Sequence, residues 1–351
     1  MIIVRLIKYN SITNLIDNIK KDKCYSWLYN KRDEIKGIII SPDTDGFISA
    51  LFLNEVYGWK VVGFYDGKVL ATLKSIDFKN NKEKYAFIDV EILRKGIKSI
   101  GHHILLWDSN KPPKLITSIQ NEMANPNNWR GMCANKDEKF KRKYPFGTFH
   151  LLISLVYYLY PNKKFFNSNP EDALIPSIFV DGVFKNLFNY PENCLDWLKY
   201  LTNNDSNHPL EILLNHPTSI KELTGLIKDF LDELNASWTT QKKDRKGKIT
   251  LYRKGKLEDI KKIENDYYLD KTVSNELHNY LKHLANRYKW NFDVNNWNVL
   301  KDKLDVVIFD KKINETRKKY YDEAIRQKPI SLAIISKNKG LQYTIDNKNI
   351  F

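Results

Sequence analysis

The stretch "GIIISPDTDGFISALFLNEVYGW" (residues 37–59) places an apolar strand, a short acidic turn and an apolar helix in direct succession. Residues 37–41 form a continuous β-branched run, which predicts a short, fully buried strand. Residues 46–58 carry apolar side chains at mixed spacings of three and four, which predicts a helix. Two carboxylates, Asp43 and Asp45, stand between these elements. Either Asp45 caps the helix, or the two acids hold something positively charged.

Strands and helices alternate along the first half of the chain. Further strands are predicted at residues 59–66, 84–89 and 99–108, and the apolar segment 146–160 predicts a buried helix. Alternation at these lengths is typical of βαβ units. We therefore predict an α/β fold in which helices flank a mostly parallel sheet, with a second, smaller α/β domain towards the C-terminus.

The sequence changes character near residue 200, where polar helical patterns become dominant. We predict a first domain over residues 1–200, a helical and basic connector over residues 201–270, and a small C-terminal α/β domain over residues 271–351. The connector holds the most basic segment of the chain, residues 241–262, which contains ten Lys or Arg residues.

The bulk composition is typical of a folded protein that prefers anionic partners. The 351 residues carry a formal net charge of +15, and 42% of them are hydrophobic, which allows a sizeable core and disfavours global disorder. The positive charge favours polyanions, with nucleic acid ahead of anionic membrane surfaces. The alternative is a soluble protein from a lysine- and asparagine-rich proteome.

Cysteine spacing and hydropathy bear on the location of the protein. The three cysteines lie far apart without a C-x-x-C pair, which disfavours zinc ribbons and disulfide frameworks and fits a reducing, cytoplasmic location. The N-terminal residues lack the long apolar core and the cleavage site of a signal peptide. The longest apolar run, residues 149–160, is too short to span a bilayer, so no membrane partner is expected.

Acids and histidines gather at the ends of the predicted strands. Asp43 and Asp45 follow one strand, Asp89 ends another, and His102 and His103 lie within a third. In open α/β sheets, ligands bind at the carboxyl ends of the strands, so we expect these side chains to converge. Asp-rich sites with one or two imidazoles suit Mn²⁺ or Mg²⁺ better than Zn²⁺. A pair of such ions can activate a water and clamp a phosphate.

The ordered set "SPDTDG" (41–46), "FID" (87–89) and "GHH" (101–103) resembles the DHH phosphoesterases, and especially the RecJ-type single-strand exonucleases. The series in that family runs His-x-Asp-x-Asp-Gly, a strand-end Asp, Asp-His-His, and a later Asp in a helical segment. The segment "DALIPSIFVDGV" (172–183) resembles the helix that carries this last acid. The similarity covers about residues 37–190.

The resemblance implies a site for one or two Mn²⁺ or Mg²⁺ ions. It implies that Asp43 binds a first ion, that Asp89 bridges both ions, and that His103 faces the substrate phosphate. His103 and Asp89 are therefore the candidate catalytic residues. The remaining ligands, which would share the second ion, are Asp45, His102 and Asp181.

Two positions depart from the family pattern. Ser41 stands where the family has its first His, and Gly101 stands where it has the Asp of Asp-His-His. Glu91, Asp108 or water could replace the missing imidazole at the first ion; otherwise the site holds a single ion or none. Loss of the Asp removes an anchor for the metal cluster.

Three functions remain open on these grounds. The resemblance and the positive charge favour a metal-dependent phosphodiesterase, a nuclease that hydrolyses single-stranded DNA or RNA or short oligonucleotides. The departures at Ser41 and Gly101 favour a catalytically inactive DHH-like scaffold that binds nucleic acid or partner proteins. The third alternative is a phosphoesterase for cyclic dinucleotides or other small molecules.

The basic segment of the connector offers a candidate track for a single strand. Lysines neutralise phosphates, and aromatic residues such as the nearby Trp238 and Tyr252 stack on bases. The alternative is a solvated hairpin or linker. The candidate nucleic-acid-binding residues are Lys242, Lys243, Arg245, Lys246, Lys248, Arg253 and Lys254.

Overall fold

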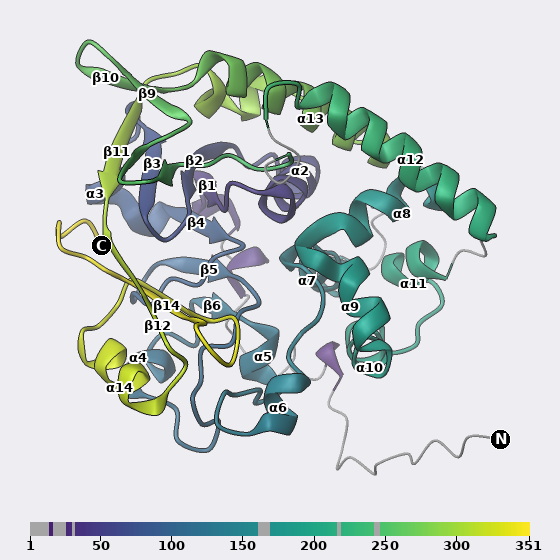
Figure 1. Ribbon diagram of the computed structural model, residues 1–351, viewed down its shortest axis with the longest axis horizontal. Coiled ribbons are helices and arrows are strands. Elements are labelled where there is room, and N and C mark those ends of the chain that lie inside the picture. Colours follow the sequence, from purple (N-terminus) through teal and green to yellow (C-terminus); the bar gives the residue numbers. More distant parts are fainter. Residues whose placement is uncertain (1–13, 17–25, 30–31, 161–168, 216–218, 242–245) are drawn as a thin grey trace.

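The structure, a computed structural model, is an α/β protein built around one large sheet (Figure 1). A second, three-stranded sheet lies beside it near the C-terminus. The residues that the structure describes are 14–16, 26–29, 32–160, 169–215, 219–241 and 246–351.

Nine strands of the described chain form the large sheet. The strands β6, β5, β4, β1 and β2 pair in parallel, whereas β3, β11, β10 and β9 extend the sheet through antiparallel pairs. Only β3 and β10 run opposite to the rest of this described sheet, so the predicted mostly parallel sheet is confirmed. In order across the sheet the strands are β6 (Met123–Ala124), β5 (Lys98–Ile100), β4 (Tyr85–Ile88), β1 (Gly37–Ile40), β2 (Val61–Tyr65), β3 (Val69–Leu73), β11 (Leu304–Ile308), β10 (Asp266–Leu269) and β9 (Ile260–Ile263).

The three strands that carry the predicted site residues are direct neighbours. β1 pairs with β4, and β4 pairs with β5, each in parallel. The isoleucines of β1, Ile38, Ile39 and Ile40, are fully buried, as expected for a central parallel strand that is covered on both faces. The carboxyl ends of these strands therefore meet at one edge of the sheet.

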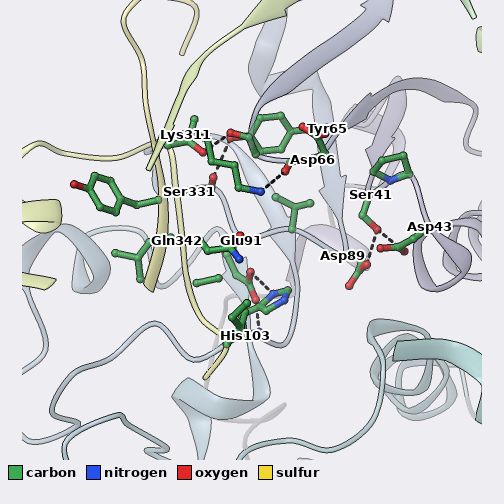
Figure 2. A pocket seen from close by; sticks show the side chains of 18 of the residues that line it. Ser41, Asp43, Tyr65, Asp66, Asp89, Glu91, His103, Lys311, Ser331 and Gln342 are labelled. Atoms are coloured by element: carbon green, nitrogen blue, oxygen red, sulfur yellow. Dashed lines mark hydrogen bonds and ion pairs between the residues drawn. The ribbon is translucent and has the colours of Figure 1, made fainter. Parts of the chain in front are cut away.

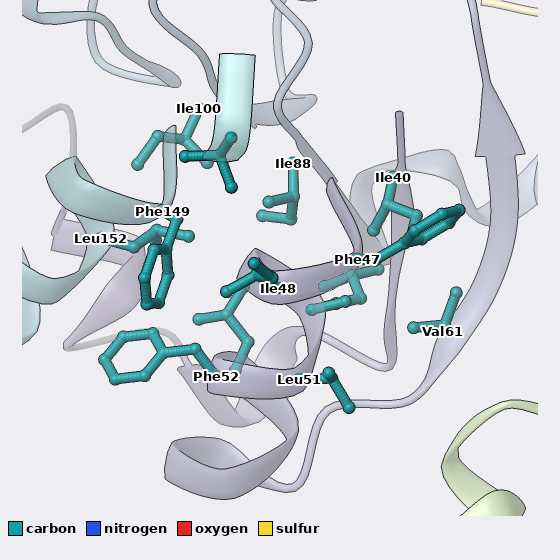
Figure 3. Packing of buried hydrophobic residues seen from close by; sticks show 14 of the residues in the cluster. Ile40, Phe47, Ile48, Leu51, Phe52, Val61, Ile88, Ile100, Phe149 and Leu152 are labelled. Atoms are coloured by element: carbon teal, nitrogen blue, oxygen red, sulfur yellow. The ribbon is translucent and has the colours of Figure 1, made fainter. Parts of the chain in front are cut away.

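The helix after β1, α2 (Thr44–Tyr57), is held rigidly by the core. Its residues are buried from Thr44 to Asn54. Figure 3 shows its apolar side chains between those of the parallel strands and those of α7 (Thr148–Leu159). One such contact joins Phe52 and Phe149, whose ring centroids lie 6.1 Å apart in an edge-on arrangement. Because α2 is packed on all sides, its acidic first turn has a fixed position.

Helices cover the sheet and pack on one another. α2 contacts α7 and α13, and α8 contacts α11, α12 and α13. Within the described residues, every helix is too short or too polar to cross a membrane. The other α-helices are α3 (Phe78–Asn81), α4 (Lys114–Thr117), α5 (Pro126–Trp129), α6 (Asp137–Lys141), α8 (Pro170–Phe179), α9 (Val183–Asn189), α10 (Pro191–Thr202), α11 (Pro209–Leu214), α12 (Ile220–Ser237), α13 (Lys271–Tyr288) and α14 (Lys318–Arg326), and the 3₁₀ turns are η1 (Ser26–Leu28), η2 (Arg32–Glu34), η3 (Lys82–Lys84), η4 (Val180–Gly182), η6 (Val294–Asn296) and η7 (Asn298–Leu300).

The small sheet consists of β12 (Asp310–Asn314), β14 (Leu341–Ile345) and β13 (Ser331–Ile334), with β14 in the middle and α14 against it. It is attached to the large unit by backbone hydrogen bonds. Ile334 N donates to Ile104 O at 2.8 Å, and Leu93 N donates to Ile330 O at 2.6 Å. The small sheet therefore sits over the segment that follows β4 and β5.

The division of the chain differs from the predicted parts. Within residues 271–351, the small unit is built from β12, α14, β13 and β14, whereas α13 packs on α2 and β11 joins the large sheet. Within residues 201–270, β9 and β10 also belong to that sheet. The physical reason is the exposed edge of β3, which β11 covers along its whole length from Leu304 to Ile308.

One predicted element ends earlier than the pattern indicates, and another has one interruption fewer. The strand predicted at residues 99–108 ends at Ile100, and the two histidines follow it in irregular backbone. Residues 171–190 are predicted to be helical at both ends with interruptions at Pro176 and Gly182, but Pro176 lies inside α8 without ending it. The interruption at Gly182 is present as the turn η4, where Asp181 has a φ of 45°.

Candidate metal centre

The first acid of the opening motif, Asp43, caps helix α2. Its backbone is extended, and its side chain accepts a hydrogen bond from Gly46 N at 3.2 Å. The helix begins at Thr44, so the residue that caps it is Asp43, and the alternative in which Asp45 is the cap is wrong. The same carboxylate accepts a hydrogen bond from Ser41 Oγ at 3.0 Å. Asp43 is therefore both a cap and a member of a polar cluster.

The second acid, Asp45, points from α2 towards the beginning of α7. Its two oxygens accept hydrogen bonds from the backbone N–H groups of Thr148, at 2.6 Å, and Phe149, at 3.0 Å. The positive end of the α7 dipole favours a carboxylate at this place. Asp45 is only 3% exposed, so these contacts fix its orientation.

Gly147 allows this close approach, because a Cβ atom at that position would lie 2.7 Å from Asp45 Oδ2. We expect Gly147→Ala to displace the Asp45 carboxylate, to lower the free energy of unfolding by about 1–3 kcal/mol, and to weaken divalent-ion binding. Urea unfolding and Mn²⁺ titration measure both effects.

The matched control is Gly225→Ala in α12, where an added Cβ meets nothing within 4 Å. There we expect a gain of up to about 1 kcal/mol from helix propensity. Unchanged stability and unchanged ion binding in Gly147→Ala would show that Asp45 is not held against Gly147.

Asp89 follows β4 and occupies the centre of the cluster. Its φ is 63°, a left-handed conformation that Asp and Asn adopt more readily than most residues. Its Oδ2 accepts from Ser41 Oγ at 2.5 Å, and its Oδ1 accepts from Thr148 Oγ1 at 2.7 Å. The turn at Asp89 thus aims a buried carboxylate between the acids of α2 and the histidines.

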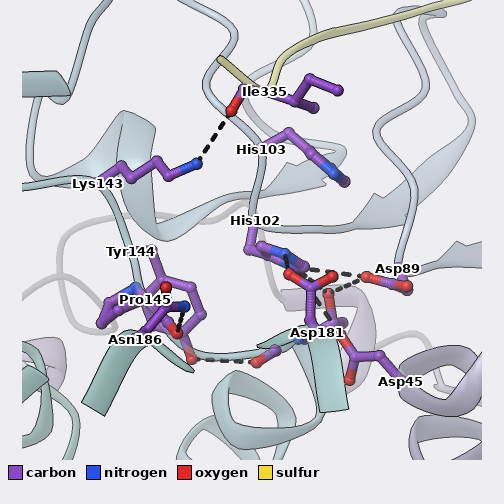
Figure 4. Close-up of polar contacts among 12 residues, drawn as sticks. Asp45, Asp89, His102, His103, Lys143, Tyr144, Pro145, Asp181, Asn186 and Ile335 are labelled. Atoms are coloured by element: carbon purple, nitrogen blue, oxygen red, sulfur yellow. Dashed lines mark hydrogen bonds and ion pairs between the residues drawn. The ribbon is translucent and has the colours of Figure 1, made fainter. Parts of the chain in front are cut away.

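His102 completes a group of three candidate ligands (Figure 4). Its Nδ1 lies 3.4 Å from Asp89 Oδ1 and 4.0 Å from Asp45 Oδ2, and it also contacts Thr148 Oγ1 at 2.9 Å. One ligand atom from each of Asp45, Asp89 and His102 lies within 4.8 Å of the others, and all three residues are buried. The three residues could hold a metal ion.

Asp181 approaches His102 from the opposite side of the ring. Its Oδ2 lies 2.8 Å from His102 Nε2, so it contacts the nitrogen that faces away from Asp45 and Asp89. The left-handed backbone of Asp181 and the following Gly182, with φ of 45° and 70°, turns the carboxylate into the site between α8 and α9. Unlike the other acids, the Asp181 side chain is 52% exposed.

The charges of this cluster are incompletely balanced. Burial raises the pKa of Asp43 to about 7, with repulsion from Asp89, and for the same reasons the pKa of Asp45 is raised well above its ordinary value. Burial opposes charging of His102, but Asp181 and Asp89 raise its pKa well above the ordinary range. His102 in turn lowers the pKa of Asp181 and of Asp89 against the effect of burial. A cation in the cluster would remove the repulsion that favours protonated carboxyl groups.

Side chains outside the predicted ligand set hold the histidine segment in place. Asn127 Nδ2 donates to His102 O at 2.5 Å, and Asn127 Oδ1 accepts from Tyr144 N at 2.8 Å. Thr148 joins Asp89 to His102 through its hydroxyl group. Their local signals, an Asn-Pro-Asn turn and a Thr at a helix start, are common in sequences without a site, because both are ordinary capping residues.

A cavity of about 270 Å³ lies between this cluster and the small sheet (Figure 2). Figure 2 shows Asp43 and Asp89 on one side and Lys311 on another. Burial lowers the pKa of Lys311, whose Nζ donates to Asp66 O at 2.9 Å and, among the described residues, forms no ion pair with a carboxylate. The cavity is thus lined by acids and imidazoles on the large unit and by a largely buried cation from β12. From β13 and β14 it is lined by Ser331, Leu332, Ala333, Gln342, Tyr343 and Thr344.

The described part of the basic segment reaches the cavity at two residues, Lys248 and Ile249. The backbone of Lys248 forms an isolated antiparallel β-bridge with that of Asp43. The next residue, Ile249, donates its N–H to Pro42 O at 2.8 Å. Lys246 instead donates to Asn235 Oδ1 on α12.

The other members of the segment do not line the cavity. Arg253 belongs to the two-stranded sheet of β7 (Tyr252–Arg253) and β8 (Lys256–Leu257), and Lys254 lies in the turn between these strands. This arrangement matches the hairpin alternative for that part of the segment. Three candidates, Lys242, Lys243 and Arg245, lie outside the described residues.

The two proposed replacements for the missing imidazole have other partners. Glu91 lies against His103, and a hydrogen bond of 3.1 Å joins its Oε2 to His103 Nδ1. Asp108 accepts from Asn110 N at 2.9 Å and does not line the cavity. The place beside Asp43 and Asp89 is taken by the Ser41 hydroxyl alone among the described side chains.

Comparison of the chain with protein-family models, with curated proteins and with solved structures finds no match.

Proposed function

We propose that the protein is a metal-dependent phosphodiesterase of the DHH type that hydrolyses single-stranded nucleic acid or short oligonucleotides. The observation that carries the proposal is the buried group of Asp45, Asp89 and His102 beside a cavity that Lys248 and Lys311 also line. Oxygen-rich ligands with one imidazole suit Mn²⁺ or Mg²⁺. A bound ion supplies the Lewis acidity that activates a water and polarises a phosphoryl group.

The residues of the chain divide the work by position. Asp89, in the centre, would contribute a carboxylate to the ion or ions that the cluster binds. His103, whose side chain is 32% exposed, lines the cavity and would contact a phosphate oxygen. Lys248 and Lys311 line the same cavity from two further directions and would offset the charge of a phosphate group.

The size of the cavity favours a short substrate or the end of a strand. About 270 Å³ lies just below the range of roughly 300–1,000 Å³ that is usual for small-ligand sites. The small sheet closes one side, so the cavity suits a small phosphoester or the end of a strand better than the middle of a long strand. This feature also supports a second candidate function, hydrolysis of cyclic dinucleotides or other small phosphoesters.

The experiment is a hydrolysis assay with Mn²⁺ on three labelled substrates: a long single strand, a five-residue oligonucleotide and a cyclic dinucleotide. We expect product from the oligonucleotide and none after Asp89→Asn. Product from the cyclic dinucleotide alone would favour the second candidate. No product from any substrate, with Mn²⁺ bound, would contradict both and leave the scaffold function that Ser41 suggests.

Binding of a single strand should depend strongly on salt, because lysine–phosphate contacts release counterions. We expect the double variant Lys246→Ala/Lys248→Ala to reduce the slope of log affinity against log salt by about 1.4, that is, about 0.7 for each lysine–phosphate pair that the variant removes. Fluorescence anisotropy with a labelled strand gives this slope.

The control is the double variant Lys228→Ala/Lys318→Ala. These two exposed lysines form ion pairs within their own helices, with Asp232 and Asp322 respectively. Its slope should equal that of the wild type. Equal slopes in all three proteins would assign the segment to the solvated hairpin instead.

A further inference from the structure

A buried carboxylate, Glu91, lies directly behind His103 at the cavity (Figure 2). Glu91 is 3% exposed, and its Oε1 accepts hydrogen bonds from His103 N at 2.6 Å and from Asn125 Nδ2 at 3.0 Å. Its Oε2 lies 3.1 Å from His103 Nδ1. One side chain thus contacts both the backbone and the ring of the same histidine.

Gly101 provides the space that this carboxylate fills. A Cβ atom at position 101 would lie 2.5 Å from Glu91 Oε1 and 2.7 Å from Glu91 Cδ. Because Gly101 has no left-handed backbone requirement, the contact with Glu91 is what excludes a side chain there. A carboxylate at position 91 and a side chain at position 101 therefore exclude each other.

The contacts around His103 leave one ring nitrogen available. A carboxylate that accepts two N–H groups acts as an acceptor towards Nδ1 as well, so the ring hydrogen lies on Nδ1. The ring also stacks on His102, with centroids 4.8 Å apart. Asn125 Nδ2 holds the backbone by donating to His103 O at 2.8 Å. Among the described residues nothing hydrogen-bonds to His103 Nε2, which lies on the other side of the ring from Glu91.

We propose that Glu91 is the positioning residue of His103: it fixes the Nδ1–H tautomer and directs Nε2 to the substrate. Carboxylates that hold a functional imidazole in this way are known to set both its tautomer and its orientation. The catalytic consequence rests on the proposed function, whereas the tautomer and the orientation do not.

Glu91→Gln tests the proposal with nearly unchanged volume. A glutamine cannot accept from His103 N and Asn125 Nδ2 and also accept from His103 Nδ1, because one of its two acceptors is replaced by a donor. We expect kcat to fall about 10- to 100-fold, with KM and Mn²⁺ affinity little changed. The control Glu83→Gln, on an exposed residue of η3, should behave as wild type.

A double-mutant comparison separates positioning from a purely structural role. If Glu91 acts through His103, Glu91→Gln should cause no further loss of kcat in a His103→Ala background. Losses that multiply would overturn the proposal, because Glu91 would then act independently of the histidine.

A swap of the carboxylate gives the positive test. In Glu91→Ala/Gly101→Asp, the carboxylate of residue 101 would occupy the space that the Glu91 carboxylate fills in the wild type. Glu91→Gln should lose the single Nδ1–H tautomer of His103, and this double variant should recover it. The ¹⁵N shifts of the His103 ring in metal-free protein report the tautomer without any activity. A wild type that hydrolyses no phosphodiester would contradict the proposed function alone; a single Nδ1–H tautomer retained in Glu91→Gln would contradict the positioning by Glu91.

Discussion

Asp89→Asn should abolish Mn²⁺-dependent hydrolysis and remove the stabilisation that Mn²⁺ gives to the wild type. Asp89 contacts Ser41 through one oxygen and Thr148 through the other, and it lies 3.4 Å from His102 Nδ1. No other described carboxylate occupies this central position between the acids of α2 and the histidine. Loss of its charge therefore affects every ion that the cluster can hold.

Asparagine is the appropriate replacement because the φ of Asp89 is 63°. Asn adopts this left-handed conformation readily, whereas Ala would add backbone strain that has nothing to do with the metal. Removal of one charge also relieves repulsion, since Asp89 contributes to the raised pKa of both Asp43 and Asp45. The substitution also removes a charge partner of His102, which lowers the pKa of Asp89, so the Mn²⁺ effect in each variant is measured against its own metal-free form.

The measurement is thermal unfolding with and without Mn²⁺, together with the hydrolysis assay. At an ion concentration of 100 times Kd, binding adds about 2.7 kcal/mol to the wild type, and this gain should vanish in Asp89→Asn. The matched control is Asp108→Asn, which removes an acid outside the cavity and should retain the full gain. An equal Mn²⁺ effect in both variants would contradict a metal site at Asp89.

Ser41→His should tighten Mn²⁺ binding by at least about tenfold, the lower end of the effects known for partners of metal ligands. The Ser41 hydroxyl lies 3.0 Å from Asp43 and 2.5 Å from Asp89, so a ring at this position reaches the space between the two carboxylates. Ser41 is 7% exposed and lines the cavity, so the larger ring would have to extend towards that space. A neutral imidazole is a far better ligand than a hydroxyl for this class of ion.

Ser41→Ala is the control, since it removes the hydroxyl without adding a ligand, and it should not tighten binding. Calorimetric titration gives the affinity and the number of ions for each protein. If the wild type binds no ion while Ser41→His does, the natural chain is a scaffold with a dormant site. If neither affinity nor ion number changes, Ser41 does not border an ion position.

The order of elements and the convergence of the acids could be predicted from the sequence because both follow from short-range patterns. The strand before Asp43 is marked by its β-branched run and the strand before Asp89 by the apolar run "YAFI", and parallel strands bring their carboxyl ends together. The distance of 4.8 Å within the group of Asp45, Asp89 and His102 follows from that arrangement.

The rest of the site depends on contacts between distant residues that leave no local pattern. By its sequence context, Thr148 is an ordinary residue at a helix start. Lys311, in "DKKIN", has the context of an ordinary surface lysine. Glu91 becomes a partner of His103 only through the space at Gly101. The sequence pattern does not indicate β12, because its side chains are polar; its pairing with β14 is what makes it a strand.

The most direct test of a divalent-ion centre at this cluster is a calorimetric titration of Mn²⁺ into the wild-type protein at pH 6 and at pH 8. Burial and Asp89 raise the pKa of Asp43 to about 7, so a proton competes with the ion at the lower pH. Stability without metal has the opposite pH dependence: a carboxyl group with a raised pKa stabilises the fold at low pH, and this contribution is lost as the pH rises through about 7. We predict saturable binding of one or two ions per chain, tighter at pH 8 than at pH 6. No bound Mn²⁺ at millimolar concentration at either pH would contradict the metal centre.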